Sequence, residues 1–554
     1  MENKHVKEYR KFKTISLADR TWPDKEITQA PIWCSVDLRD GNQALPKPMG
    51  IREKMEMFLF LKNMGFKEIE IGFPSASETE YRFLRKLIDE GATEGVTIQV
   101  LTQAREHLIK RTFEALKGVE KAIVHVYNST STQQRNMVFR KSQAEIKDIA
   151  IAGAKMLVEE AAKYPETEFI FEYSPESFTG TEMEYAVDVC NAVIDVWQPT
   201  PEKKCILNIP ATVEMSSPNV YADQVEWFCR NIDKRDSVLV SLHAHNDRGT
   251  AVAATELAML AGADRVEGTL FGNGERTGNV DILNVAMNMY SQGIDPQIYV
   301  EQINEITKMY KRCTGMDIHD RHPYAGALVY TAFSGSHQDA IRKGLEFNKE
   351  NNSIFWDVPY LPLNPDHIGR KYEPIIRINS QSGKGGVAFI LEQEFGYKLP
   401  KKMHPEVSVS VQKVSDDTGK ELKPNEIFEI FSNEFVNVKE PLSLVSFKST
   451  YKDDEKDKVK VKGSVLLDGE EKSIRGMGNG PISAFFNAIK ELGYDGYKLI
   501  DYTEHAISDG ADAIAAAYIV LSDKDGIMHY GVGTDANINK ASVIALISAL
   551  NRFA

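Results

Sequence analysis

The sequence has few cysteines and no long apolar run. No two of its cysteines form a C-x-x-C pair, and their number is odd, which is typical of reduced thiols in a cytosol and not of a disulfide framework. The five are Cys34, Cys190, Cys205, Cys229 and Cys313. The first 26 residues are charged throughout and lack an apolar core, so they predict neither a secretory signal nor an anchor. No stretch is long enough to span a bilayer, and we expect a cytoplasmic protein without membrane association.

Basic residues are also fewer than acidic residues. The chain has 66 lysines and arginines against 80 acidic residues, which gives a net charge of -14. A polyanion would meet an unfavourable field, because no local basic patch offsets this charge, and nucleic acid is therefore disfavoured as a partner. Hydrophobic residues make up 42% and charged residues 26%, a composition typical of folded soluble proteins. A length of 554 residues predicts two or three domains.

Eight short β-rich runs, each followed by a segment of helical period, occupy residues 31–330. Near-continuous apolar strands suit a parallel sheet buried on both faces, and the helices supply the crossovers that parallel pairing needs. Eight units close most naturally into a (β/α)8 TIM barrel, whose chemistry lies at the carboxyl ends of the strands. An open, doubly wound sheet is the alternative. The runs are WCSVDL, KEIEIG, TIQVL, KAIVHVY, EFIFEY, CILNI, SVLVSLH and DRVEG.

The pattern changes after the barrel. We assign residues 1–30 to an amino-terminal extension, 331–425 to a helical linker subdomain and 426–554 to an α+β domain. The last part is interpreted as two sets of strands, each followed by one helix, which indicates an internal duplication. The predicted helices are Pro481 to Leu492 and Asn539 to Leu550, and the charged run KDDEKDK from Lys452 is predicted to be a solvated hairpin tip.

The sharpest local signal is LHAHND, in which His243 and His245 lie two residues apart at the end of a predicted strand. A period of two puts both rings on one face. Two imidazoles at the mouth of a barrel form part of a coordination sphere for a divalent metal. On this spacing alone, hydrogen-bonded core histidines are an equally good interpretation.

The first predicted strand ends in VDLRDGNQ and brings two carboxylates to the same mouth. Asp40, beside Gly41 at a sharp turn, is the better metal ligand, whereas Asp37 alternates to the wrong side. Arg39 could clamp a substrate carboxylate in bidentate fashion, or could form an ion pair with either aspartate. Gln43 from the same segment also reaches this mouth.

The glycine-rich segment EGTLFGNGERTGN follows the eighth predicted strand and delivers Glu275, Arg276 and Asn279 to the same end. Its glycines do not fit G-x-G-x-x-G, and the segment ends a barrel instead of opening a βαβ unit. The run SGKGG from Ser382 likewise lacks the spacing of a phosphate-binding loop. These segments therefore do not predict a nucleotide site.

Together these motifs resemble those of the 2-isopropylmalate synthases, Claisen-condensing enzymes related to homocitrate and citramalate synthases. The resemblance spans nearly the whole chain and includes a carboxyl-terminal leucine-regulatory domain. The motifs that carry it are LRDGNQ, FPSASETE, HVYNSTS, YSPESFTGTE, NIPATVEMSSP, HAHNDRG, GNGERTGN and YTAFSGSHQDA.

The resemblance implies roles for individual residues. It places the metal ligands on Asp40, His243 and His245, with Asn279 as a further ligand, direct or through water. Mg or Mn is the implied metal, with Zn as the strongest challenger because imidazoles favour it. Potassium is a further possible activator.

Other matched positions are implied to handle the organic substrates. Arg39 and Thr212 correspond to residues that hold the 2-oxo acid, and His125 and Glu176 to other active-site positions. His337 and Tyr372 correspond to residues implicated in the condensation, supplied by the linker region of a partner subunit. We take His337 as the base that removes a proton from the acetyl methyl group. Glu176 is expected to orient His337 or to activate water.

The implied reaction joins acetyl-CoA to 3-methyl-2-oxobutanoate, with leucine as an inhibitor and a homodimer as the assembly. Pyruvate or 2-oxoglutarate as substrate would instead make a citramalate or homocitrate synthase. A metal-dependent aldolase or lyase on the same barrel is a rival that needs no CoA. A silent amino-acid sensor is a third, disfavoured by the intact ligand residues.

Overall fold

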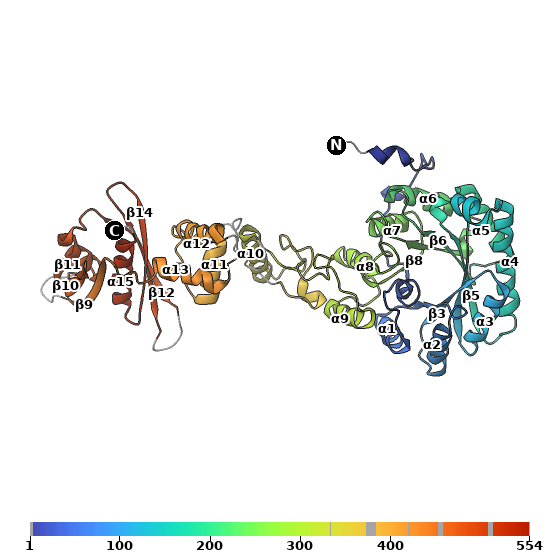
Figure 1. The fold of residues 1–554 in the computed structure, drawn as a ribbon, viewed down its shortest axis with the longest axis horizontal. Helices are drawn as coiled ribbons and strands as arrows, with labels where there is room; N and C mark the ends of the chain where they lie inside the picture. The colour runs from blue at the N-terminus through green and yellow to red at the C-terminus, as the bar shows by residue number, and fades with distance from the viewer. Residues whose placement is uncertain are drawn as a thin grey trace. The chain divides into compact units, whose positions relative to one another are not determined.

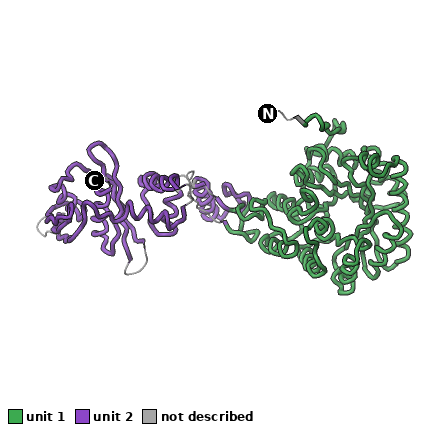
Figure 2. The backbone as a smooth tube through the Cα atoms, viewed as in Figure 1, with its two compact units in different colours: residues 1–330, 363–371 green, residues 331–362, 372–554 purple. Residues whose placement is uncertain are grey.

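The computed structural model forms two compact units (Figure 2), which are described separately below. Unit 1 comprises residues 1–330 and 363–371, and unit 2 comprises residues 331–362 and 372–554. Residues 452–457 of the expected hairpin tip and residues 382–383 of the run SGKGG lie outside the described residues. The structure describes residues 4–332, 334–372, 384–418, 422–451, 458–507 and 513–552.

Unit 1 is a closed barrel of eight parallel strands in sequence order, with β1 paired to β8. Helices form a ring around these strands (Figure 1). This confirms the predicted barrel and excludes the open sheet. The strands are β1 Ile32–Ser35, β2 Glu68–Gly72, β3 Thr97–Gln103, β4 Lys121–Ser129, β5 Glu168–Glu176, β6 Cys205–Ala211, β7 Val238–Ala244 and β8 Arg265–Gly268.

Helices surround this sheet, and their starts show how the sequence specifies them. Helix α4 opens with a capping box in which Ser142 and Glu145 satisfy each other's backbone N–H groups. Helix α2 opens on Ser77, whose side chain accepts from the Glu80 N–H. The helices are α1 Ile51–Met64, α2 Glu78–Asp89, α3 Glu106–Leu116, α4 Gln143–Ala161, α5 Met183–Trp197, α6 Pro218–Asn231, α7 Ala251–Leu260, α8 Ile282–Ser291 and α9 Ile303–Thr314.

Unit 2 begins with helices, as predicted for the linker, and ends in two three-stranded antiparallel sheets. Their strand orders are β11-β10-β9 and β12-β13-β14. The helices are α10 Gly335–Asn351, α11 Lys384–Phe395, α12 His404–Thr418, α13 Pro424–Phe435, α14 Pro481–Ile489 and α15 Ile538–Asn551. The strands are β9 Leu442–Tyr451, β10 Val459–Leu467, β11 Glu470–Gly478, β12 Lys498–Ala506, β13 Ala515–Ser522 and β14 Met528–Asp535.

The internal duplication has a physical signature in paired glycines. A Cβ atom on Gly476 or Gly478 of β11 would collide with the backbone of α14. A Cβ atom on Gly531 or Gly533 of β14 would collide with the backbone of α15 in the same way. Each G-x-G therefore lets a helix lie directly on its sheet, which supports the predicted repeat of strands followed by one helix.

Strand β13 joins two cores of unit 2. Its residues alternate between the faces of the sheet, so that Ala517 and Ile519 pack with α14 and α15, whereas Ala516 and Tyr518 pack with α11 to α13. The linker helices α11 and α12, together with α13 at the start of the predicted last domain, thus share a core with the sheet that follows them. None of the helices in the described part of the chain is long and apolar enough to cross a membrane.

Candidate functional site

The turn after β1 carries two of the expected site residues. The strand ends at Ser35, three residues earlier than the run WCSVDL predicts, and a π-helical turn over Asp37–Gly41 follows it. Lys54 holds this turn, because its fully buried Nζ donates to the Leu38 carbonyl over 2.9 Å. The same Nζ pairs with Glu80 at 2.6 Å, which compensates the buried charge.

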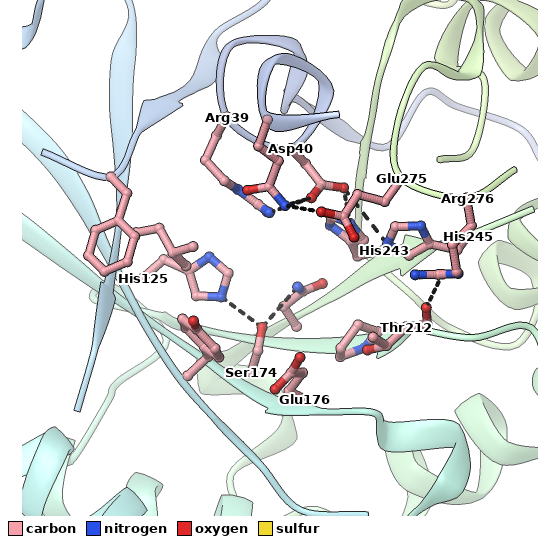
Figure 3. Close-up of a pocket in the computed structure, with 16 residues that line it drawn as sticks. Arg39, Asp40, His125, Ser174, Glu176, Thr212, His243, His245, Glu275 and Arg276 are labelled. Carbon is pink, nitrogen blue, oxygen red and sulfur yellow. Dashed lines mark hydrogen bonds and ion pairs between the residues drawn. The ribbon is translucent and has the colours of Figure 1, made fainter. Parts of the chain in front are cut away.

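Asp40, His243 and His245 meet at the carboxyl end of the barrel (Figure 3). Asp40 Oδ2 lies 3.4 Å from His243 Nε2 and 3.8 Å from His245 Nε2. One potential ligand atom from each residue falls within 4.8 Å of the others, and all three side chains are buried. The structure thus brings together the acid and the two imidazoles that the sequence singles out.

Three buried atoms at this cluster have no hydrogen-bond partner among the described residues. They are Asp40 Oδ2, His245 Nδ1 and the carbonyl oxygen Oδ1 of Asn279. Asn279 uses its amide nitrogen to donate to the Asn273 carbonyl over 3.0 Å, and its backbone bridges to that of His245. Buried polar atoms normally have partners. A carboxylate, two imidazoles and an amide oxygen suit a divalent cation, so these residues fit a metal site.

The protonation states of the cluster depend on one another and on burial. Burial alone would raise the pKa of Asp40, but the neighbouring Arg39 and the two histidines hold it well below its usual range. Burial opposes the charged form of His243, yet the neighbouring carboxylates of Asp40 and Glu267 raise its pKa to about 9. Burial, together with the charge of His243, lowers the pKa of His245 to about 4. Asp40 is therefore an anion and His245 a neutral imidazole, whereas His243 favours a protonated form whose proton a bound cation would have to displace.

Glu267 of β8 lies behind His243, and the sequence analysis did not single it out. Its Oε2 lies 2.9 Å from His243 Nδ1, which leaves Nε2 of that ring directed at Asp40. Arg265 donates to its other oxygen over 2.6 Å. A carboxylate that fixes the orientation of a ligating histidine is a common support of metal sites.

A pocket of about 290 Å³ opens above these residues. One side is a chain of hydrogen bonds: Arg39 donates to Glu70 over 2.6 Å, and Glu70 also contacts His125 Nδ1 at 3.1 Å. His125 Nε2 then contacts Ser174 Oγ at 2.7 Å (Figure 3). Arg39 also pairs with Asp40 at 2.8 Å, so the ion pair considered from the sequence forms, and Glu70 is a second partner.

Glu176 and Thr212 line the opposite side of the pocket. Glu176 ends β5 and accepts a hydrogen bond from Ser129. Thr212 follows β6, and its hydroxyl accepts from the Ser177 N–H over 2.9 Å. Arg276 donates to the Thr212 carbonyl and is held by Asp247 at 2.7 Å. All eight strands, or the segments that follow them, thus contribute residues to this pocket, as a barrel mouth requires.

His337 and Tyr372 belong to unit 2 and do not line the barrel pocket. His337 is exposed in the first turn of α10, and its ring stacks on Tyr360 with centroids 4.0 Å apart. Tyr372 is half-buried, and burial raises the pKa of its hydroxyl. The structure therefore groups eight of the ten predicted site residues, and the roles of these two stay predictions.

Asp37 faces away from the cluster, toward the Leu270 N–H and Ser35. Its burial makes the stability of the protein depend on pH. Burial raises the pKa of its carboxyl from 3.8 to about 7. Because the folded-state pKa lies above the unfolded one, ionisation of Asp37 lowers the free energy of unfolding as pH rises between these two values. The full loss is about 4 kcal/mol. D37N should therefore raise the thermal unfolding midpoint more at about pH 8 than at about pH 4. An equal effect at both would contradict the account.

Three family models match successive parts of the chain. Residues 30–309 match the HMGL-like family, and residues 327–392 match the alpha-isopropylmalate synthase, post-catalytic domain-like family. Residues 421–554 match the LeuA allosteric (dimerisation) domain. The matched ranges cover the barrel, the first linker helices and both terminal sheets.

Whole-length relatives agree with these matches. A 2-isopropylmalate synthase of Clostridium acetobutylicum is 57% identical over 550 residues, which cover 98% of each chain. A 2-isopropylmalate synthase of Acetoanaerobium sticklandii is 54% identical over 99% of this chain and 97% of the relative. One of Rhodospirillum rubrum is 53% identical over 98% of both. This chain therefore belongs to the 2-isopropylmalate synthase family.

Proposed function

We propose that this chain condenses acetyl-CoA with 3-methyl-2-oxobutanoate and water to give 2-isopropylmalate and CoA, the committed step toward leucine. The observation that carries the proposal is the buried Asp40, His243 and His245 cluster at the mouth of a barrel, in a chain 57% identical to a 2-isopropylmalate synthase over its full length. The five cysteines are all unpaired, which favours the cytoplasm as the compartment.

A divalent cation held by Asp40, His243 and His245, with Asn279 as a further ligand, would polarise the ketone of the oxo acid and stabilise the alkoxide that forms. Mg or Mn suits a site that must exchange substrate oxygens, and Zn is the alternative because imidazoles favour it. The partnerless oxygens of Asp40 and Asn279 support this ligand set.

Arg39 and Thr212 are proposed to hold the oxo acid. Arg39 donates a hydrogen bond from Nε to Glu70 and another from Nη1 to Asp40. Its Nη2 makes no hydrogen bond to any residue in the described ranges. That remaining N–H edge is available to a carboxylate, and the two ion pairs fix its direction. The Thr212 hydroxyl accepts from Ser177 N–H and can donate its own proton to a substrate oxygen.

His337 is proposed as the base that removes a proton from the acetyl methyl group. Tyr372 is proposed as a second residue of the condensation, and unit 2 of a partner subunit would supply both. His337 is exposed, and an imidazole has a nitrogen that can accept a proton, which suits a general base. Glu176 is proposed to orient that imidazole or to activate the water that hydrolyses the thioester. It lines the pocket and accepts from Ser129, so its other oxygen can take a second partner.

The last of the four predicted domains, residues 426–554, is expected to bind leucine and to hold two subunits together. The match to the LeuA allosteric (dimerisation) domain over residues 421–554 supports this role. Leucine would lower activity by favouring one of two arrangements of the chain, as effector coupling requires.

Hydrogen exchange on the full chain tests the leucine site. We expect leucine to protect amides of β12 to β14 and of α14 and α15, because ligand binding suppresses local opening. The full chain is preferable to one cut after residue 425, since the cut would remove Phe431 and Phe435 from the core of α11 to α13. Protection confined to residues 31–330 would contradict the proposed site.

A thiol-release assay tests the reaction. The protein is stripped of metal, reconstituted with Mg, Mn or Zn, with and without potassium, and given acetyl-CoA with each of three oxo acids. We expect release of CoA only with metal and fastest with 3-methyl-2-oxobutanoate. Preference for pyruvate or 2-oxoglutarate would instead indicate a citramalate or homocitrate synthase. Cleavage of 2-isopropylmalate without any dependence on CoA would indicate a lyase.

A further inference from the structure

Three glutamates lie inside the barrel below the pocket, and each is completely buried. They are Glu70 of β2, Glu172 of β5 and Glu267 of β8. Two guanidinium groups reach this level, Arg39 from the mouth and the fully buried Arg265 of β8. Three ionised acids would outnumber these two guanidinium groups, and all three acids are completely buried. The charge of each acid therefore needs a physical explanation.

Two of the three acids are well supplied with donors. Glu70 accepts from Arg39 over 2.6 Å and from Gln99 over 3.2 Å. Glu267 accepts from Arg265 over 2.6 Å and from Gln99 over 3.0 Å, and His243 lies 2.9 Å from its second oxygen. Charge-assisted bonds of this length are what a buried carboxylate needs to stay ionised.

Glu172 differs from both. Neither of its oxygens accepts a hydrogen bond from any described residue. Arg265 Nη1 lies 3.6 Å from Oε2, and His125 Nδ1 lies 3.4 Å from Oε1, while each of these donors has a nearer acceptor in Glu267 or Glu70. An ionised carboxylate in this position would lack the donors that its burial demands.

We propose that Glu172 is a neutral carboxylic acid that donates its proton to Glu267, and that it is a positioning residue for the pair formed by Glu267 and His243. Potential ligand atoms of Glu172, Glu267 and His125 lie within 4.8 Å of one another, so Glu267 is a near acceptor. A carboxyl group that keeps its proton can donate, which turns an unpaired anion into a donor for the neighbouring anion.

The charges around Glu172 agree with this assignment. Burial first, and then the negative charge of Glu267, raise the pKa of Glu172 well above its ordinary value, and Arg265 opposes them only in part. The titratable groups that face Glu172 are His125 from β4, Glu70 from β2, and Arg265 and Glu267 from β8. Ionisation of Glu172 would add a third buried anion among them.

A second cation is the competing occupant, since His125, Glu172 and Glu267 have the composition of a metal site. Their own partners argue against it. Arg265 already supplies a positive charge 2.6 Å from Glu267, and His125 uses both ring nitrogens toward Glu70 and Ser174. A proton removes the charge of Glu172 and makes one of its free oxygens a donor to Glu267 without displacing any of these contacts.

Infrared difference spectroscopy of the full chain at neutral pH tests the protonation directly. The spectrum of wild type minus E172Q should contain a carboxylic-acid carbonyl band, and in E172D that band should shift without disappearing. Absence of the band in wild-type protein would overturn the proposal. The measurement on the wild type and E172D keeps the test valid if E172Q does not fold.

Metal titration by equilibrium dialysis tests the positioning role. E172Q keeps a neutral donor of the same size, whereas E172A removes the donor to Glu267, so E172A should bind metal about tenfold more weakly than E172Q. Equal affinities would overturn the positioning role. Loss of one of two bound metal ions in E172Q would show that the cluster holds a cation instead.

The pH profile of condensation is the one readout that rests on the proposed function. Activity of wild-type protein should fall at alkaline pH as Glu172 ionises, and E172Q should lack that fall. An identical alkaline fall in both proteins would overturn the role of Glu172. If the chain shows no condensation activity at all, the proposed function fails, while the infrared band and the metal affinities still decide the state of Glu172.

Discussion

Replacing Asp40 by asparagine is expected to lower turnover by about 10³-fold and to remove most of the bound metal. The substitution keeps the size of the side chain but deletes the negative charge that faces both imidazoles, at 3.4 Å from His243 and 3.8 Å from His245. A metal that stabilises an alkoxide contributes several kcal/mol, and each 1.36 kcal/mol corresponds to about tenfold in rate. CoA release and metal content, measured on the same preparation, check the result.

D37N is the matched control for this variant. Asp37 lies in the same π-helical turn and is equally buried, but its oxygens face the Leu270 N–H and Ser35 instead of the cluster. We expect D37N to bind metal as wild type does and to keep turnover within about tenfold. If D40N keeps its metal, or if both variants lose it equally, Asp40 has no special role in binding.

Replacing Glu267 by glutamine is expected to weaken metal binding by about 10- to 100-fold. Glu267 never reaches the pocket, but its carboxylate orients His243 and makes that imidazole a stronger ligand. The amide of glutamine would offer either a donor that repels the ring N–H or an uncharged oxygen that polarises it less. Equilibrium dialysis with Mn gives the affinity, and thermal unfolding shows whether the fold survives.

E68Q is the control for the loss of charge around Arg265. Glu68 and Glu267 both accept from the Arg265 guanidinium over 2.6 Å, at Nε and at Nη1, but only Glu267 also touches His243. We expect E68Q to alter stability and not the affinity for metal. Equal loss of affinity in the two variants would mean that Glu267 acts through Arg265 and not through the histidine.

Local periodicity was sufficient to predict the barrel and the meeting of the two imidazoles. Because strand residues alternate faces, His243 and His245 had to point the same way, and the closed barrel places the end of β1 beside the end of β8. The end of β1 itself was predicted three residues too late, since pairing with β2 and β8 stops at Ser35. The turn that follows depends on Lys54 and on Asn273, which donates to the Gly41 carbonyl, and both are distant in sequence.

The buried charges could not be predicted in this way. The runs DRVEG, which contains Glu267, and KEIEIG, which contains Glu70, were interpreted as strands. An alternating pattern does not indicate which other strand a side chain inside the barrel will contact. Glu267 contacts residues of β3, β6 and β7, and such contacts follow from barrel closure. The repeat in unit 2 was predicted from element order alone, and its cause, the two G-x-G pairs under α14 and α15, is visible only in the packing.

Anomalous diffraction from crystals of the full chain, grown with Mn and 3-methyl-2-oxobutanoate, tests the central claim most directly. The account predicts one strong peak at the barrel mouth, bonded by a carboxylate oxygen of Asp40 and by Nε2 of His243 and of His245, with the oxo acid on the same ion. A peak elsewhere, or a mouth that holds the oxo acid without any ion, would contradict it.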